Sequence, residues 1–123
     1  MHHDKGLLLV FTNPTDGHDE DFNAWYDSTH VPEVLAVPGV VAARRYELAP
    51  VDTPEVEGAP APPPPAHRYL AAYELDRDGN EVMADFVGRL MSGEMSLSET
   101  LDMTTVGLSV WRPRPAASPP SDD

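Results

Sequence analysis

The chain has 123 residues and a formal net charge of −13, so an anionic nucleic acid or membrane surface would repel it. It contains no cysteine, which excludes disulfides, thiolate nucleophiles and cysteine-ligated iron or zinc. No apolar run approaches the ~18 residues of a membrane span, and the polar start has no signal-peptide pattern, so we expect a soluble, cytoplasmic protein.

The first half of the chain predicts strand, helix and strand. Residues 6–12 are a continuous apolar run, typical of a strand buried on both faces. A helix is expected over residues 20–30, and Pro32 predicts a kink or a fresh short helix after it. Residues 40–48 read as a strand with alternate side chains on one face, among them Val40, Arg44 and Tyr46. The expected apolar stripe of the helix consists of Phe22, Trp25, Tyr26 and Thr29.

Proline then interrupts the pattern, because the 14 prolines are more than twice the ~5% background and are clustered. Residues 49–66 hold four consecutive prolines, which cannot form a central strand, so we expect a solvated, partly polyproline-II loop. An SH3 or WW ligand is the less favoured interpretation of this loop. Residues 116–123 are expected to be a disordered tail, which leaves a single domain over residues 1–115.

The second half repeats the order strand, helix, strand. Strands are expected over residues 67–75 and 104–112, with a helix over residues 81–91 and an irregular stretch at 92–100. The first of these strands places Tyr69, Ala71, Tyr73 and Leu75 on one face. The expected apolar stripe of the helix consists of Val82, Met83, Phe86, Val87 and Leu90.

The order β-α-β-β-α-β is that of the ferredoxin-like α+β fold, in which a four-stranded antiparallel sheet carries two helices on one face. The other face is then bare, although the expected strands are apolar on both faces. A second copy that covers this face would resolve the conflict, with two sheets facing each other as an α+β barrel. We therefore expect a homodimer.

The first helix carries the candidate chemistry. At 100° per residue, Tyr26, Thr29, His30 and Glu33 share the face of Phe22 that packs on the sheet. Two ionisable groups on a buried face must pair, reach water or line a cavity. Histidine suits proton transfer, because its ordinary pKa of about 6.5 is close to neutral pH. A hydrogen-bonded structural histidine is the alternative.

The stretch Phe22-Asn23-Ala24-Trp25-Tyr26-Asp27-Ser28-Thr29-His30-Val31-Pro32-Glu33, followed by Val37-Pro38-Gly39 and Ala43-Arg44-Arg45-Tyr46, resembles the EthD-like branch of the dimeric α+β barrel superfamily. The resemblance covers residues 22–46, whereas the loop 49–66 departs from the compact family pattern. It implies a ferredoxin-like fold, a homodimer paired through its sheets, and a pocket near His30 between sheet and helices, with Trp25, Tyr26 and Pro32 as neighbours. The superfamily includes cofactor-free monooxygenases, lactone isomerases, polyketide cyclases and haem enzymes, so it selects no reaction.

His30 and Tyr26 are the catalytic candidates, with His30 as general acid or base and Tyr26 as a donor to a substrate oxygen. One of the neighbours Arg44 and Arg45 should face the helices or the dimer cavity, where it could bind an oxyanion or pair with Glu33 or Asp27. The expected substrate-binding residues are Phe22, Trp25, Glu33, Arg44 and Tyr46, although Phe22 and Trp25 could equally be core.

No organic cofactor is expected, because the chain has no GxGxxG or P-loop motif. His30 and Glu33 have the i, i+3 spacing of metal ligands, but Pro32 interrupts the helix between them, so no metal is expected either. Haem ligation through His30 is suggested only by the haem enzymes of the superfamily that the sequence resembles.

The favoured function is a proton-transfer enzyme, of the isomerase, cyclase, lyase or O₂-using monooxygenase type, acting on a small apolar oxygenated or aromatic metabolite. A non-catalytic small-molecule binding or accessory protein is the alternative. A third hypothesis, a purely structural dimer, would have His30, Glu33 and an arginine as an internal ion pair.

Overall fold

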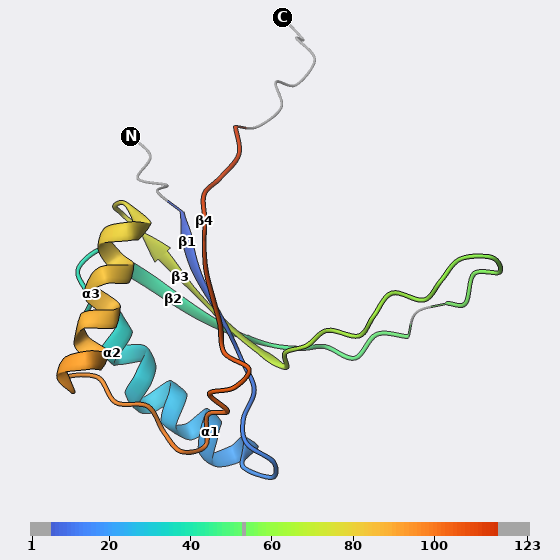
Figure 1. The fold of residues 1–123 in the computed structure, drawn as a ribbon, viewed down its shortest axis with the longest axis horizontal. Coiled ribbons are helices and arrows are strands. Elements are labelled where there is room, and N and C mark those ends of the chain that lie inside the picture. The colour runs from blue at the N-terminus through green and yellow to red at the C-terminus, as the bar shows by residue number, and fades with distance from the viewer. Residues whose placement is uncertain (1–5, 53, 116–123) are drawn as a thin grey trace, which may run out of the picture.

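The computed structural model describes residues 6–52 and 54–115 (Figure 1). Four strands, β1 (Leu7–Thr12), β2 (Val40–Glu47), β3 (Tyr69–Leu75) and β4 (Gly107–Trp111), form one antiparallel sheet in the order β2-β3-β1-β4. The helical segments α1 (Asp19–Trp25), η1 (Tyr26–His30), α2 (Val31–Leu35) and α3 (Gly79–Ser92) all lie on one side of it (Figure 1). This arrangement confirms the predicted α+β, ferredoxin-like fold.

Strand β1 occupies the centre of the sheet between β3 and β4. Its residues Leu8, Val10 and Thr12 are buried under the helices, whereas Leu7 on the other face is exposed. The expectation of a strand buried on both faces is therefore wrong for the single chain. Its apolar sequence supplies two apolar faces, of which the helices cover one.

The first helical stretch runs without a break through α1, η1 and α2, and η1 is a π-helical turn. A π turn closes i→i+5 hydrogen bonds and so inserts one extra residue. The insertion turns His30 toward the middle of the buried face and moves Thr29 into solvent. The expectation that Thr29 belongs to the buried stripe is therefore wrong. Pro32 lies in the first turn of α2, as predicted, where its missing N–H costs no hydrogen bond.

Strand β2 contains a bulge between Val40 and Ala42. The extra residue shifts the alternation, so that Arg45 stands opposite the buried Ala71 and faces the helices, while Arg44 stands opposite Ala72 on the other face. The expectation that Val40 shares a face with Arg44 and Tyr46 is therefore wrong. Strand β3, in contrast, keeps the predicted alternation and buries Ala71, Tyr73 and Leu75.

Helix α3 has well-defined ends. The Asp78 carboxylate accepts a hydrogen bond from the Asn80 N–H at 2.9 Å, and Gly93 ends the helix with a left-handed φ of 86°. Val82 and Phe86 are buried against the sheet, but Val87, expected in the apolar stripe, is exposed. The stretch after α3 has no helix or longer strand, as expected, and it buries Met95 and Leu101.

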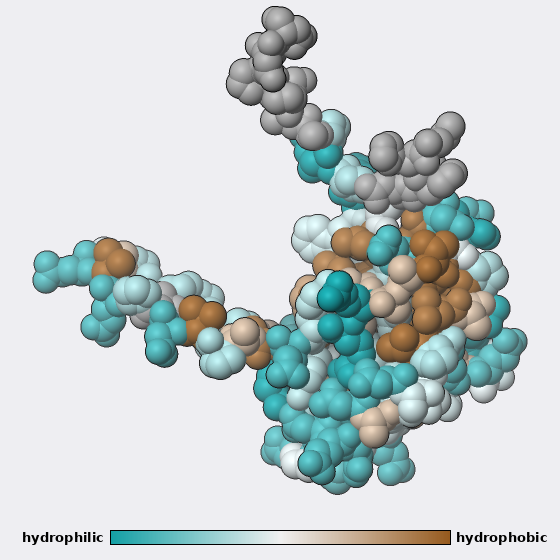
Figure 2. All heavy atoms as spheres, turned by 180° about the vertical axis from the view of Figure 1, so that it is seen from behind, coloured by the Kyte–Doolittle hydropathy of each residue, from teal (hydrophilic) through white to brown (hydrophobic). Residues whose placement is uncertain are grey.

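The sheet surface opposite the helices is called the bare face below. Figure 2 shows apolar side chains gathered there, where within the described residues no helix covers them. By the strand register it consists of Leu7, Leu9 and Phe11 of β1, Arg44 and Tyr46 of β2, Leu70, Ala72 and Glu74 of β3, and Ser109 and Trp111 of β4.

Two further expectations concern the ends of the chain and membranes. The predicted tail at residues 116–123 lies outside the described residues. Within the described ranges, every helix is too short or too polar to cross a membrane.

Candidate functional site

His30 lies at the end of the π turn, where it is 3% exposed. Its imidazole stacks on the Trp25 indole at 4.8 Å between ring centroids and 22° between planes. The Tyr26 ring meets it edge-on at 4.9 Å and 85°. The two aromatic rings fix the imidazole, because both belong to the same helical stretch one turn before it.

The imidazole is neutral at pH 7, because burial lowers the pKa of His30 to about 4, with a further contribution from the positive charge of Arg45. Its Nδ1 lies 3.9 Å from Glu33 Oε1, which is too long for a hydrogen bond. Among the described residues, neither of these two buried atoms has a hydrogen-bond partner. A neutral ring at this distance forms no ion pair, so the internal His–Glu bridge of the structural hypothesis is absent from the described part of the chain.

The His30 ring borders a cavity of about 80 Å³ between the sheet, α3 and the stretch after α3. Its polar lining residues within the described ranges are Thr12, Tyr26 and His30. The apolar walls are formed by Val10, Phe86, Leu90, Leu97, Leu101, Met103, Val106 and Leu108. Such a cavity holds a few waters or the end of a small apolar molecule, since drug-sized ligands occupy roughly 300–1,000 Å³.

Arg45 is a basic residue of β2 whose side chain faces the helices. Its guanidinium lies over the Tyr26 ring, 4.3 Å from the centroid, and donates to Asp27 Oδ1 at 2.9 Å and Asn23 Oδ1 at 2.8 Å. Its Nε is buried without a hydrogen-bond partner in the described ranges. The sequence left open whether the arginine pairs with Glu33 or with Asp27. The ion pair with Asp27 holds the positive charge of Arg45 beside Tyr26 and His30.

Two tyrosine hydroxyls complete the buried polar cluster. Burial raises the pKa of Tyr26 and that of Tyr73, and the neighbouring Tyr26 hydroxyl raises the pKa of Tyr73 further. Both hydroxyls therefore stay protonated and remain hydrogen-bond donors. No well-aligned hydrogen bond engages either of them within the described residues.

Sequence reasoning did not name Tyr73 as a site residue. It listed Arg44 as a substrate-binding residue but left open which of Arg44 and Arg45 faces the helices. The signal for Tyr73 was its place between Ala71 and Leu75 on the buried face of β3, where a hydroxyl needs a partner. Arg45 carried no such signal, because its face depends on the β2 bulge.

The structure brings together some of the predicted site residues and separates others. Phe22, Trp25, Tyr26 and Glu33 surround His30 or pack beside it on the helix side. Phe22 is wholly buried in the core, and the cavity lining includes none of Phe22, Trp25 and Glu33. Arg44 and Tyr46 lie on the bare face, on the other side of the sheet from His30.

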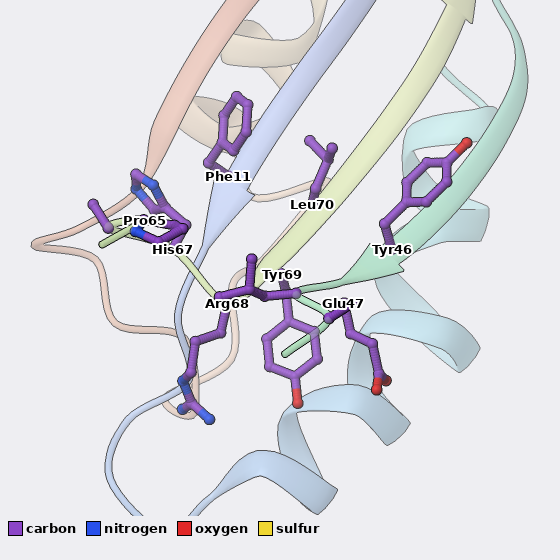
Figure 3. Close-up of a pocket in the computed structure, with 11 residues that line it drawn as sticks. Phe11, Tyr46, Glu47, Pro65, His67, Arg68, Tyr69 and Leu70 are labelled. Carbon is purple, nitrogen blue, oxygen red and sulfur yellow. The ribbon is translucent and has the colours of Figure 1, made fainter. Parts of the chain in front are cut away.

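A larger hollow, of about 410 Å³, lies on the bare face where β2 and β3 lead into residues 49–66 (Figure 3). Phe11, Tyr46 and Leu70 point into it from the sheet, and His67 and Pro65 close one end (Figure 3). His67 Nε2 is 2.6 Å from the Thr105 carbonyl oxygen, so this ring is held by the chain itself. We call this hollow the sheet groove; it is separate from the His30 cavity.

The described residues contain no cluster of three or more His, Asp or Glu side chains arranged to hold a metal ion. His30 and Glu33 are two such groups, 3.9 Å apart.

Comparisons with known proteins support the fold. HapK from Hahella chejuensis has a similar structure, with a TM-score of 0.50 and 11% sequence identity over 95% of this chain and 99% of HapK. An EthD family protein from Bacillus halodurans C-125 aligns over 89% of this chain and 99% of its own, with a TM-score of 0.49 and 12% identity. Neither a protein-family model nor a curated protein matches the sequence. The likeness to HapK agrees with the ferredoxin-like α+β fold that the order of strands and helices predicted.

Proposed function

We propose that the protein is a small-molecule enzyme without an organic cofactor, in which His30 moves a proton on a small apolar oxygenated or aromatic metabolite. The observation that carries the proposal is a buried, neutral imidazole with its pKa lowered to about 4, bordering an apolar cavity. Isomerisation, cyclisation and bond cleavage next to a carbonyl all begin with such a transfer. Addition of O₂ to an enolised aromatic substrate would begin in the same way.

The surrounding charges suit an anionic intermediate. When His30 takes a proton from a substrate C–H or O–H, the imidazolium gains an enolate or phenolate as its counter-ion, which offsets the penalty that lowers its pKa in the empty site. The Tyr26 hydroxyl, kept protonated by burial, can donate to the developing oxyanion. Arg45, over the Tyr26 ring, adds a favourable positive potential. The imidazolium then returns the proton to another atom of the substrate or to the leaving group.

A non-catalytic binding or accessory protein is the second candidate. The His30 Nδ1 and the Tyr26 hydroxyl, unpartnered among the described residues, favour it, because hydrogen bonds to a bound molecule would satisfy both atoms without any chemical step. In this case His30 and Tyr26 would orient a bound molecule without exchanging its protons.

The bare face supports a homodimer as part of the proposal. Leu7, Tyr46 and Trp111 are exposed there, and an apolar face of this kind is typical of a surface that a second copy covers. Arg44 and Tyr46 would then contact the second copy, while Arg45 lies on the helix side, over the Tyr26 ring.

Deuterium exchange separates the two functions without knowledge of the full reaction. We would incubate the protein in D₂O with a panel of small cyclic ketones, lactones and phenols and follow the loss of ¹H NMR signals from C–H groups α to the carbonyl or ortho to the phenol hydroxyl. We expect at least one member to exchange, and the His30→Gln variant to be slower by the ~10²–10⁴-fold typical of a lost general base. The control is His18→Gln, because His18 is exposed in the loop before α1. Equal exchange in the wild type and His30→Gln would contradict the enzyme.

A further inference from the structure

Residues 49–66, described apart from Thr53, form an arm that leaves the ends of β2 and β3 and projects well beyond the body of the protein (Figure 1). The Leu48 N–H donates to the Arg68 carbonyl at 2.7 Å and closes its base. At its tip the Ala59 N–H donates to the Val56 carbonyl at 3.1 Å, next to Gly58 with a left-handed φ. Every described residue of the arm is exposed, Val51 by 79% and Val56 by 64%.

The composition of the arm suits it to binding in a groove. It holds seven prolines, and a proline-rich chain loses little conformational entropy when it binds because its backbone is already restricted. Extended proline-rich segments dock in grooves lined by aromatic side chains. The sheet groove is of this kind, with Phe11 and Tyr46 beside Leu70 (Figure 3).

The charges of the arm and of the bare face are complementary. The arm carries Asp52, Glu55 and Glu57 and no basic residue. Arg44 precedes Tyr46 by two residues on the bare face, and none of the described residues forms an ion pair with it. Glu47 also lines the groove, but its carboxylate points away from Leu70, toward the helix side (Figure 3). Glu74 stands opposite Ala42 and is a diagonal neighbour of Arg44 on the same face, but no ion pair joins the two side chains in the described part of the chain.

The arm of the same chain is poorly placed to fill this groove. Leu48, Ala49, Pro65 and Ala66, the first and last residues at the base of the arm, form part of the groove wall. Both limbs run outward from that wall (Figure 1), and the fixed φ of consecutive prolines opposes a reversal of direction within one or two residues. A second copy that faces the bare sheet brings an arm from outside.

We propose that the arm of one protomer docks in the sheet groove of a second copy, with its prolines and Val56 against Phe11, Tyr46 and Leu70 and its acidic residues beside Arg44. This rests on the homodimer proposed above and adds to it a reciprocal exchange of arms. The exchange covers the exposed valines of the arm and supplies Arg44 with a counter-ion.

Engineered cysteines test the exchange directly, because the natural chain contains none. One tagged sample carries Val56→Cys at the tip of the arm, and a second, untagged sample carries Ala66→Cys in the groove wall. After mixing and mild oxidation, we expect a mixed disulfide between the two samples at least tenfold faster than with Ser92→Cys as partner. Ser92 is the matched control because it is exposed at the end of α3, on the helix side. Rates equal to this control would overturn the proposal. So would a disulfide within one chain when Val56→Cys and Ala66→Cys are combined in a single variant.

A second measurement separates the arm from the dimer. Replacing residues 50–65 by a short Gly-Ser linker should raise the dimer dissociation constant at least tenfold, as measured by sedimentation equilibrium. Arg44→Gln should raise it by a smaller factor. If the wild type is a dimer and the shortened arm leaves the dissociation constant unchanged, arm exchange is overturned and the proposed dimer stands. A wild type that is monomeric at micromolar concentration would overturn both.

Discussion

The imidazole of His30 is buried between Trp25 and Tyr26, with its Nδ1 unpartnered among the described residues and its pKa lowered to about 4. An ordinary core histidine gains a hydrogen bond that offsets the loss of water. Burial of His30 Nδ1 without a hydrogen-bond partner costs free energy. A ligand or water in the adjoining cavity would offset this cost by completing the hydrogen bonds of His30.

The lowered pKa has a consequence for stability in acid. Between pH 6.5 and 4 the unfolded chain binds a proton at His30 that the folded chain does not, so the free energy of unfolding falls as the pH falls. From pH 7 to pH 4.5 this loss amounts to about 2–3 kcal/mol at 1.36 kcal/mol per pKa unit, and above pH 6.5 it vanishes. Urea unfolding at the two pH values measures it.

His30→Gln supplies the comparison for the acid experiment, because it lacks the titrating ring. We expect its free energy of unfolding to fall by about 2–3 kcal/mol less than that of the wild type over the same range. The carboxylates with lowered pKa values, Asp19 and Asp102, lose their contribution below about pH 4 and are common to both proteins. Parallel pH profiles would show that His30 is solvated in the folded state.

The positive charge of Arg45 is expected to lower the pKa of His30. Arg45→Met keeps much of the apolar stem over Tyr26 and removes the positive charge, so the pKa of His30 should rise above about 4. It should stay below 6.5, because burial is the larger cause of the shift. NMR titration of the imidazole measures the pKa. Arg44→Met, on the bare face, is the matched control and should leave it unchanged.

At the scale of elements, the sequence predicted the order of strands and helices because hydrophobic spacing and proline positions mark them locally. It could not predict the π turn or the bulge in β2, since each inserts one residue whose place is decided by packing. The stretch Val40 to Ala43 contains no glycine or proline that would mark a bulge. These two insertions decide which of Thr29 and His30, and which of Arg44 and Arg45, face the cavity side.

The π turn can be tested by removing its extra residue. Deleting Thr29, which is exposed, converts the turn to ordinary α-helical spacing and forces either His30 or Val34 off the buried face. We expect a loss of about 2–4 kcal/mol in the free energy of unfolding, as for other disrupted core positions. Thr29→Ala keeps the spacing and should change stability by less than about 0.5 kcal/mol. Similar stabilities of the two variants would show that the register of this helix is not specified by its packing.

At the scale of the whole molecule, the thin core is a reason to predict a dimer. One layer of helices covers one face of the sheet, and a chain of 123 residues buries a limited share of its surface alone. The prediction is sedimentation as a dimer of about twice 13.4 kDa at micromolar concentration. Leu9→Glu places a charge in the middle of the bare face and should give a folded monomer. A wild-type monomer would contradict the dimer.

The positions of the two tryptophans give the molecule two separate optical reporters. Trp25 stacks on His30, so its fluorescence should be quenched when the imidazole becomes protonated and should change when a molecule enters the cavity. Trp111 is 56% exposed on the opposite side of the sheet, where its emission should shift to shorter wavelength when a second copy excludes water. With Trp25→Phe and Trp111→Phe variants, events in the cavity and association of the sheets can be followed independently in the same solution.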